Sequence, residues 1–175
     1  MDLRYPIGRF ERPAAITAEA RAAFIAAIAS APAELREAVR GLDDARLDTP
    51  YRPDGWTVRQ LVHHVPDSHL NSYVRFKLAL TEQEPTIKPY DEKGWAELPD
   101  GRGPLVDESL ALLDALHARW VYLLRAMSPA DFARTVVHPE RPGAPMTLDV
   151  MLALYAWHGK HHVAHITALR EREGW

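Results

Sequence analysis

The stretch TLDVMLALYAWHGKHHVAHITALRER, residues 147–172, decides the fold of this chain. Its residues favour one long helix that begins at a Thr147 cap and extends to about Arg172. At about 100° per residue, His158, His162 and His165 fall within about 60° of one another. They share this stripe with Met151, Leu154, Tyr155 and Leu169. A stripe that carries Met, Leu and Tyr packs inward, so the three imidazoles are predicted to point into the protein.

Buried histidines need partners, and three on one stripe are hard to satisfy by hydrogen bonds alone, so a bound metal ion is predicted. The helix offers His158/His162 and His161/His165 at i, i+4, and His158/His161 and His162/His165 at i, i+3. An i, i+4 pair can reach one ion, as in the HExxH zinc helix, although Gly159 and Lys160 stand here in place of its glutamate. The apolar stripe favours His158/His162, because His161 is rotated toward its edge.

Composition excludes several classes of protein. The 175 residues are 47% hydrophobic and carry a net charge of −3, with no long basic run, which argues against a nucleic acid or an anionic membrane as partner. With no cysteine, disulfides, iron–sulfur clusters and thiolate zinc sites are excluded, so histidine and carboxylate must hold any metal. We find no secretory signal and no membrane-spanning run. The sequence predicts one cytoplasmic domain, residues 1–175.

The rest of the chain supplies three more predicted helices. The first spans about 17–40 and is interrupted or restarted at Pro32; the second spans about 57–80, with a Thr57/Gln60 capping box and a kink at Pro66. The third spans about 106–127, and Ser128-Pro129 ends it and opens a short helical turn. Residues 81–105 form a long connection, often a sign of function, and residues 135–146 form a small hairpin or a plain loop. The fold class is therefore all-α: a four-helix bundle with a long crossover between the second and third helices.

A third metal ligand has to come from outside the fourth helix. The second helix offers His63, His64 and His69, and periodicity favours His69, which lies on its apolar stripe. His64 shares a stripe with polar residues, which is either a solvated face or the wall of a polar cleft: Gln60, Ser68, Asn71 and Arg75. Periodicity leaves these two interpretations open. His117 and His138 are isolated in the sequence, which favours surface or structural roles.

Several long motifs resemble the DinB-like superfamily, and more narrowly its YfiT-like branch of metal-dependent hydrolases and bacillithiol S-transferases. They are YPIGRF (5–10), YRPDGWTVRQLVHHVPDSHLNSYVRFKLALTE (51–82), PTIKPYDEKGWAEL (85–98), LHARWVYLL (116–124), HPE (138–140), YAWHGKHHVAHI (155–166) and GW (174–175). The resemblance covers nearly the whole chain. Pro66 departs from the family pattern, in which a helix former is more usual.

The resemblance implies a ligand set. In this family one ligand is the histidine eight residues after the Trp that opens the second helix, which is His64 after Trp56, and the others are His158 and His162. The resemblance thus favours His64 where periodicity favours His69. Contacts around the ligands and to substrate could come from Gln60, Asp67, Ser68, Asn71 and Arg75, although a surface salt bridge is an equally good interpretation of Arg75.

Three histidines around one divalent ion per subunit, zinc or nickel, leave a coordination position open, which is the catalytic pattern. The expected function is a metal-dependent hydrolase with an activated water or thiolate nucleophile. The alternatives are a transferase for a low-molecular-weight thiol such as bacillithiol, and a metal-binding stress module without catalysis. The expected partner is a small-molecule substrate, and the family resemblance implies a homodimer.

Overall fold

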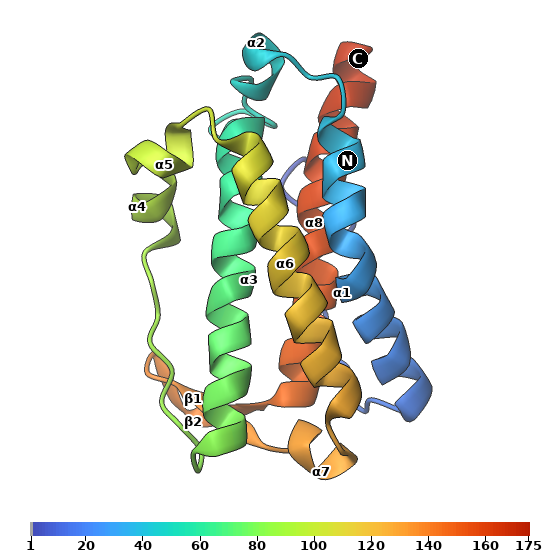
Figure 1. Cartoon of the computed structure of the whole chain (residues 1–175), viewed down its shortest axis with the longest axis vertical. Helices are drawn as coiled ribbons and strands as arrows, with labels where there is room; N and C mark the ends of the chain where they lie inside the picture. Colours follow the sequence, from blue (N-terminus) through green and yellow to red (C-terminus); the bar gives the residue numbers. More distant parts are fainter. Residues whose placement is uncertain (1) are drawn as a thin grey trace.

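The computed structural model describes residues 2–175, with the backbone alone for residues 141 and 142. Four long helices pack side by side (Figure 1): α1 (Ala18–Val39), α3 (Val58–Thr81), α6 (Val106–Ala126) and α8 (Leu148–Glu173). The remaining elements are α2 (Asp44–Leu47), α4 (Glu92–Ala96), α5 (Pro99–Arg102), α7 (Pro129–Phe132), β1 (Thr135–His138) and β2 (Arg141–Thr147). The predicted all-α four-helix bundle is confirmed, with one two-stranded hairpin added at its end.

The order of the helices explains the long crossover. Helices α1 and α3 each pack against both α6 and α8. His63 and Ser109, near the starts of α3 and α6, lie 2.7 Å apart, so these neighbours run parallel. Because α3 has 24 residues and is therefore about 36 Å long, the chain must return along its length before α6 begins. Figure 1 shows this return, with α4 and α5 beside the first half of α3.

Side chains cap the helices where the sequence predicts. Thr57 and Gln60 form the expected capping box at the start of α3, and the Thr147 hydroxyl accepts from the Val150 amide at the start of α8. Helix α8 ends at Gly174, whose φ of 70° places it in the left-handed region that glycine adopts readily. The ends of α3 and α8 are therefore fixed locally by the sequence.

Pro32 does not interrupt the first helix, contrary to the prediction. Helix α1 runs unbroken from Ala18 to Val39, and α3 likewise continues through Pro66. A proline inside a helix removes one backbone hydrogen bond, but Pro32 is buried against the bundle, and packing offsets the loss. The carbonyl of Ile28, four residues before Pro32, therefore has no amide donor at the usual helical position.

The segment 135–146 adopts the hairpin, one of its two predicted conformations. Strands β1 and β2 are antiparallel, with Val136 opposite Met146. The crossover pairs with β1, since the Ile87 amide donates to the Val137 carbonyl at 2.9 Å. The hairpin thus holds the start of the crossover at the lower end of the bundle (Figure 1).

The apolar core consists of two clusters with histidines between them. One cluster surrounds Phe76, Trp120 and Leu152, and the other surrounds Leu61, Leu113 and Ile166. The histidines of α3, α6 and α8 lie between these positions along each helix: His63, His64, His69, His117, His158, His161, His162 and His165. Within residues 2–175, no helix combines the length and apolar content needed to cross a membrane.

Candidate metal centre

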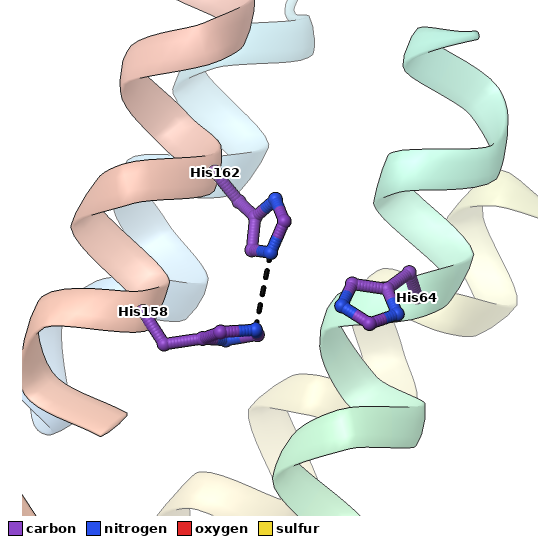
Figure 2. A group of neighbouring side chains, drawn as sticks. All are labelled: His64, His158 and His162. Atoms are coloured by element: carbon purple, nitrogen blue, oxygen red, sulfur yellow. Dashed lines mark hydrogen bonds between the residues drawn. The ribbon is translucent and has the colours of Figure 1, made fainter. Parts of the chain in front are cut away.

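Three histidines from two antiparallel helices meet at one point inside the bundle. His64 projects from α3 toward His158 and His162 of α8 (Figure 2). One ring nitrogen of each lies within 4.8 Å of the others. His64 and His162 are buried and His158 is partly exposed. The structure therefore brings together the three residues that the family resemblance implies as ligands.

The spacing of these nitrogens suits a shared divalent ion. The Nε2 atoms of His158 and His162 lie 3.1 Å apart. With metal–nitrogen bonds of about 2.0–2.1 Å, neighbouring ligands lie ~3.3 Å apart around a tetrahedral ion and ~3.0 Å apart around an octahedral one. The observed separation falls between these values. A ring nitrogen of His64 lies within 4.8 Å of both other ligand atoms, so the three residues offer a donor set that fits a divalent metal ion.

Burial keeps the three imidazoles in the form that binds metal. It lowers the pKa of His64 to about 4. For His158 and His162, burial is again the largest cause and places the pKa of each well below its usual range; the neighbouring imidazoles lower it further. A histidine ligand must be neutral, so all three rings are ready to bind near pH 7.

Aromatic packing fixes the His64 ring. The Trp56 ring, which lies just before the start of α3, packs against His64 with centroids 4.8 Å apart. The capping box formed by Thr57 and Gln60 sets the direction in which α3 begins. The Trp56-to-His64 spacing that carries the family resemblance thus corresponds to a physical contact.

His69, which periodicity favours as the third ligand, lies elsewhere. It is fully buried behind His158, with its Nε2 atom 3.1 Å from the His158 Nδ1 atom. Its own Nδ1 atom faces His117 at 2.8 Å. His117 is buried at 2% exposure, so of the two roles predicted for it the structural one fits. His138 lies in β1, where its ring accepts from the Glu140 amide.

A pocket opens over the three histidines. It has a volume of about 640 Å³, which is typical of sites for small molecules. Its walls carry both signs of charge, from Arg4, Arg52, Asp54, Glu92, Lys93 and Glu97. Aromatic rings complete the walls: Tyr5, Tyr51, Trp56 and Trp157. The crossover thus contributes directly to the pocket, as its length suggested.

Comparison with known proteins identifies the family. The model of the DinB superfamily matches residues 27–166. The chain belongs to the DinB superfamily. A Bacillus mycoides (strain KBAB4) protein is 58% identical over 174 residues, and a Bacillus cereus (strain B4264) protein is 57% identical, each comparison covering 99% of both chains. Both relatives bear the name "Putative metal-dependent hydrolase".

A solved structure confirms the YfiT-like branch. YfiT from Bacillus subtilis, described as "a probable metal-dependent hydrolase with an unusual four-helix bundle topology", matches with a TM-score of 0.97 and 49% identity. The match covers 100% of this DinB-superfamily chain and 99% of YfiT. The topology with parallel neighbours α3 and α6 is thus shared with a solved bundle.

A second histidine pair lies beside the first in this DinB-superfamily bundle. The Nε2 atoms of His161 and His165 are 3.1 Å apart, and both side chains line the pocket. His161 stacks on Trp157 with centroids 4.4 Å apart, and His165 lies against Tyr51 at 4.3 Å. The helical periodicity predicts His161 at the edge of the buried face, yet its side chain is buried, with 8% of its surface exposed.

The polar stripe of α3 faces the crossover. Gln60 Nε2 donates to the Ala96 carbonyl at 2.9 Å, and Asn71 Nδ2 donates to the Asp67 carbonyl within α3. Arg75 Nη2 donates to the Lys88 carbonyl at 3.3 Å.

Asp67 and Ser68 belong to the same covered surface. Burial raises the pKa of Asp67 to about 6, and Ser68 is buried. The stripe is therefore packed against the crossover and is not the solvated face of the two predicted alternatives. The bonds of Gln60 and Arg75 hold the crossover rather than the three histidines.

Proposed function

We propose that this chain is a hydrolase that uses one divalent metal ion, zinc or nickel, held by His64, His158 and His162. The observation that carries the proposal is the convergence of three neutral imidazoles within 4.8 Å at the base of an open pocket. Three histidines leave a coordination position free, which is typical of catalytic rather than structural sites. The names of the relatives point to the same class.

The chemistry follows from the ligand set. When bound, the ion acts as a Lewis acid and lowers the pKa of a coordinated water from about 15.7 toward 7, which supplies a nucleophile at neutral pH. The histidines hold the reacting centre at the junction of α3 and α8, which are rigid parts of the bundle. The neutral ligands add no negative charge, so they reduce the Lewis acidity of the ion less than carboxylate ligands would.

The pocket walls bind and orient a small polar substrate. Arg4, Arg52 and Lys93 supply positive charge for an anionic group, and Glu92 and Glu97 supply negative charge for a cationic one. The rings of Tyr51, Trp56 and Trp157 provide apolar surface that excludes water around the histidines. We infer a small molecule that carries charged groups of its own.

A second candidate is transfer of a low-molecular-weight thiol to an electrophile. The group of three histidines contains no carboxylate, so it brings no general base with it. A thiolate held by a divalent ion needs little further activation, whereas hydrolysis also requires protonation of a leaving group. The two candidates differ in whether turnover requires an added thiol.

Zinc- and nickel-loaded protein assayed against nitrophenyl esters, nitrophenyl phosphates and nitroanilides tests the proposal. We expect hydrolysis without thiol at least about tenfold above the metal-free protein and the His158→Ala variant. His138→Gln removes a histidine outside the pocket and should retain the rate. Turnover of monobromobimane only with added thiol would replace the hydrolase by the transferase. A cobalt-substituted protein whose spectrum is unchanged by azide or thiol would indicate a non-catalytic metal module.

A further inference from the structure

A chain of buried imidazoles leads away from the proposed metal ligands. His158 Nδ1 lies 3.1 Å from His69 Nε2, and His69 Nδ1 lies 2.8 Å from His117 Nε2. His117 Nδ1 then lies 2.6 Å from the carbonyl oxygen of Ile28. The exposed fractions of His69 and His117 are 0% and 2%, so water does not compete for these bonds. Three imidazoles from α8, α3 and α6 thus end at a carbonyl of α1.

The terminal carbonyl allows one arrangement of protons. A carbonyl oxygen only accepts, so His117 must carry its proton on Nδ1 and offer an unprotonated Nε2. His69 must then donate through Nδ1, which leaves its Nε2 free to accept from His158 Nδ1. His158 Nε2 is therefore unprotonated and faces His162. Protonating His69 or His117 on both nitrogens would place two donors against each other.

Burial supports the neutral state that this pattern requires. It lowers the pKa of His117, the ring that contacts the Ile28 carbonyl, to about 4. Neutral imidazoles have two tautomers, and the partner of one ring nitrogen decides which nitrogen carries the proton. In this chain each ring decides the tautomer of the next.

The Ile28 carbonyl is available because of a proline. In a helix this oxygen would accept from the amide of the residue four positions later, which here is Pro32 and has no N–H. The proline that lies inside α1 therefore frees the acceptor that His117 uses. At Gly159, an added Cβ would lie 3.3 Å from the Ala31 side chain and 3.7 Å from His69 Cε1. The absence of a side chain there lets α8 approach Ala31 of α1 closely, with His69 in ordinary contact beside it.

We propose that His69 and His117 are positioning residues, which lock His158 in the tautomer that presents an unprotonated Nε2 to the metal, with the Ile28 carbonyl as the anchor. This inference rests on the proposed function for the metal, but the tautomers themselves are a property of the metal-free protein. A ligating histidine commonly donates its other N–H to an oxygen acceptor. Here the acceptor is a ring nitrogen of a second histidine, His69, which is held in turn by a third, His117.

Long-range ¹H–¹⁵N correlation spectra of metal-free protein at pH 7.5 test the tautomers directly. We expect protonated Nδ1 and unprotonated Nε2 in His158, His69 and His117. A His158 ring protonated on Nε2, or a mixture of tautomers in His69, would overturn the inference. This readout needs no metal and no activity, so it stands apart from any failure of the proposed function.

Zinc affinity, measured by chelator competition, tests the consequence for binding. His69→Leu removes the acceptor and should weaken zinc binding about 10- to 100-fold, whereas His69→Gln, whose amide oxygen can accept from His158, should regain part of that loss. His63→Gln is the matched control for losing a buried histidine, because His63 bonds Ser109 and the Gly103 carbonyl, which lie outside the chain of imidazoles. Wild-type affinity in His69→Leu would contradict the positioning role. A wild-type protein that binds no zinc would instead defeat the proposed function.

Discussion

Two histidine pairs on α8 have the same spacing and different surroundings. In both His158/His162 and His161/His165 the Nε2 atoms are 3.1 Å apart, across one helical turn. Both pairs are thus equally able to span an ion by their own geometry. What differs is the set of side chains that each pair meets across the bundle.

The first pair meets a third imidazole and a hydrogen-bonded support. His64 of α3 lies opposite it, and His69 stands behind His158. The second pair meets aromatic rings, Trp157 against His161 and Tyr51 against His165. Within residues 2–175, one group of three or more ligand-capable residues was found, and it contains the first pair only.

Ligand spacing on one helix therefore does not define a metal site. The decisive features are a third donor from another element and a partner that fixes the tautomer of the ligand. Aromatic neighbours supply neither, so the second pair becomes part of the pocket wall.

The largest expected effect is a difference in metal binding between two variants, each of which lacks one histidine of one pair. His162→Ala deletes a proposed ligand and should weaken zinc binding by more than about 100-fold. This loss exceeds the roughly 10- to 100-fold loss that is typical when a residue hydrogen-bonded to a ligand is removed. His165→Ala should keep one zinc per chain. Elemental analysis after exhaustive dialysis measures both. Equal metal content in the two variants would remove the distinction between the pairs.

Acidification should destabilise the metal-free protein because both pairs and their neighbours are buried neutral. Burial lowers the folded-state pKa of His64 and His117 from 6.5 to about 4, so between these values the unfolded chain binds more protons. Stability is then full above pH 6.5 and falls as the pH drops; each of these residues costs roughly 2 kcal/mol at pH 5. Urea unfolding at pH 7.5 and pH 5 measures the loss. An unfolding free energy that is flat over this range would show that these rings are not buried neutral.

Gly159→Ala should have the smallest effect. The residue follows His158, and its added methyl would press on Ala31 and approach His69. The helix propensity gained, about 1 kcal/mol, offsets the packing cost, so thermal unfolding should change little. Zinc affinity should fall by less than about tenfold, because the methyl contacts His69, which hydrogen-bonds His158, and leaves the ligand His158 itself in place. Ala164→Gly, elsewhere on α8, is a control that should leave zinc affinity unchanged. Equal affinity in wild type and Gly159→Ala would show that His69 tolerates the methyl.

The sequence predicts the four helices, their caps and the fourth-helix pair because these depend on local patterns. Periodicity fails at His64 and His69 for a physical reason. A helical wheel treats the polar stripe of α3 as potentially solvated, but α4 and α5 cover it, and Gln60 bonds the Ala96 carbonyl there. The first half of α3 is thus buried on both faces, and only the family resemblance pointed to His64.

Other features depend on contacts between distant segments. The chain from His158 to the Ile28 carbonyl joins four helices, and no local pattern relates these positions. The sequence shows that Pro32 is unusual inside the first helix. Its consequence, a free Ile28 carbonyl that accepts from His117, depends on a contact between α1 and α6 that the sequence does not reveal. Tyr51, the aromatic partner of His165, likewise comes from a connecting segment.

The most direct test of the central claim is anomalous diffraction at the zinc edge from crystals of zinc-loaded protein. We predict one strong peak per chain, about 2.0–2.1 Å from a ring nitrogen of each of His64, His158 and His162, with Nε2 as the ligand atom of His158. A peak at His161 and His165, or none between α3 and α8, would contradict the account.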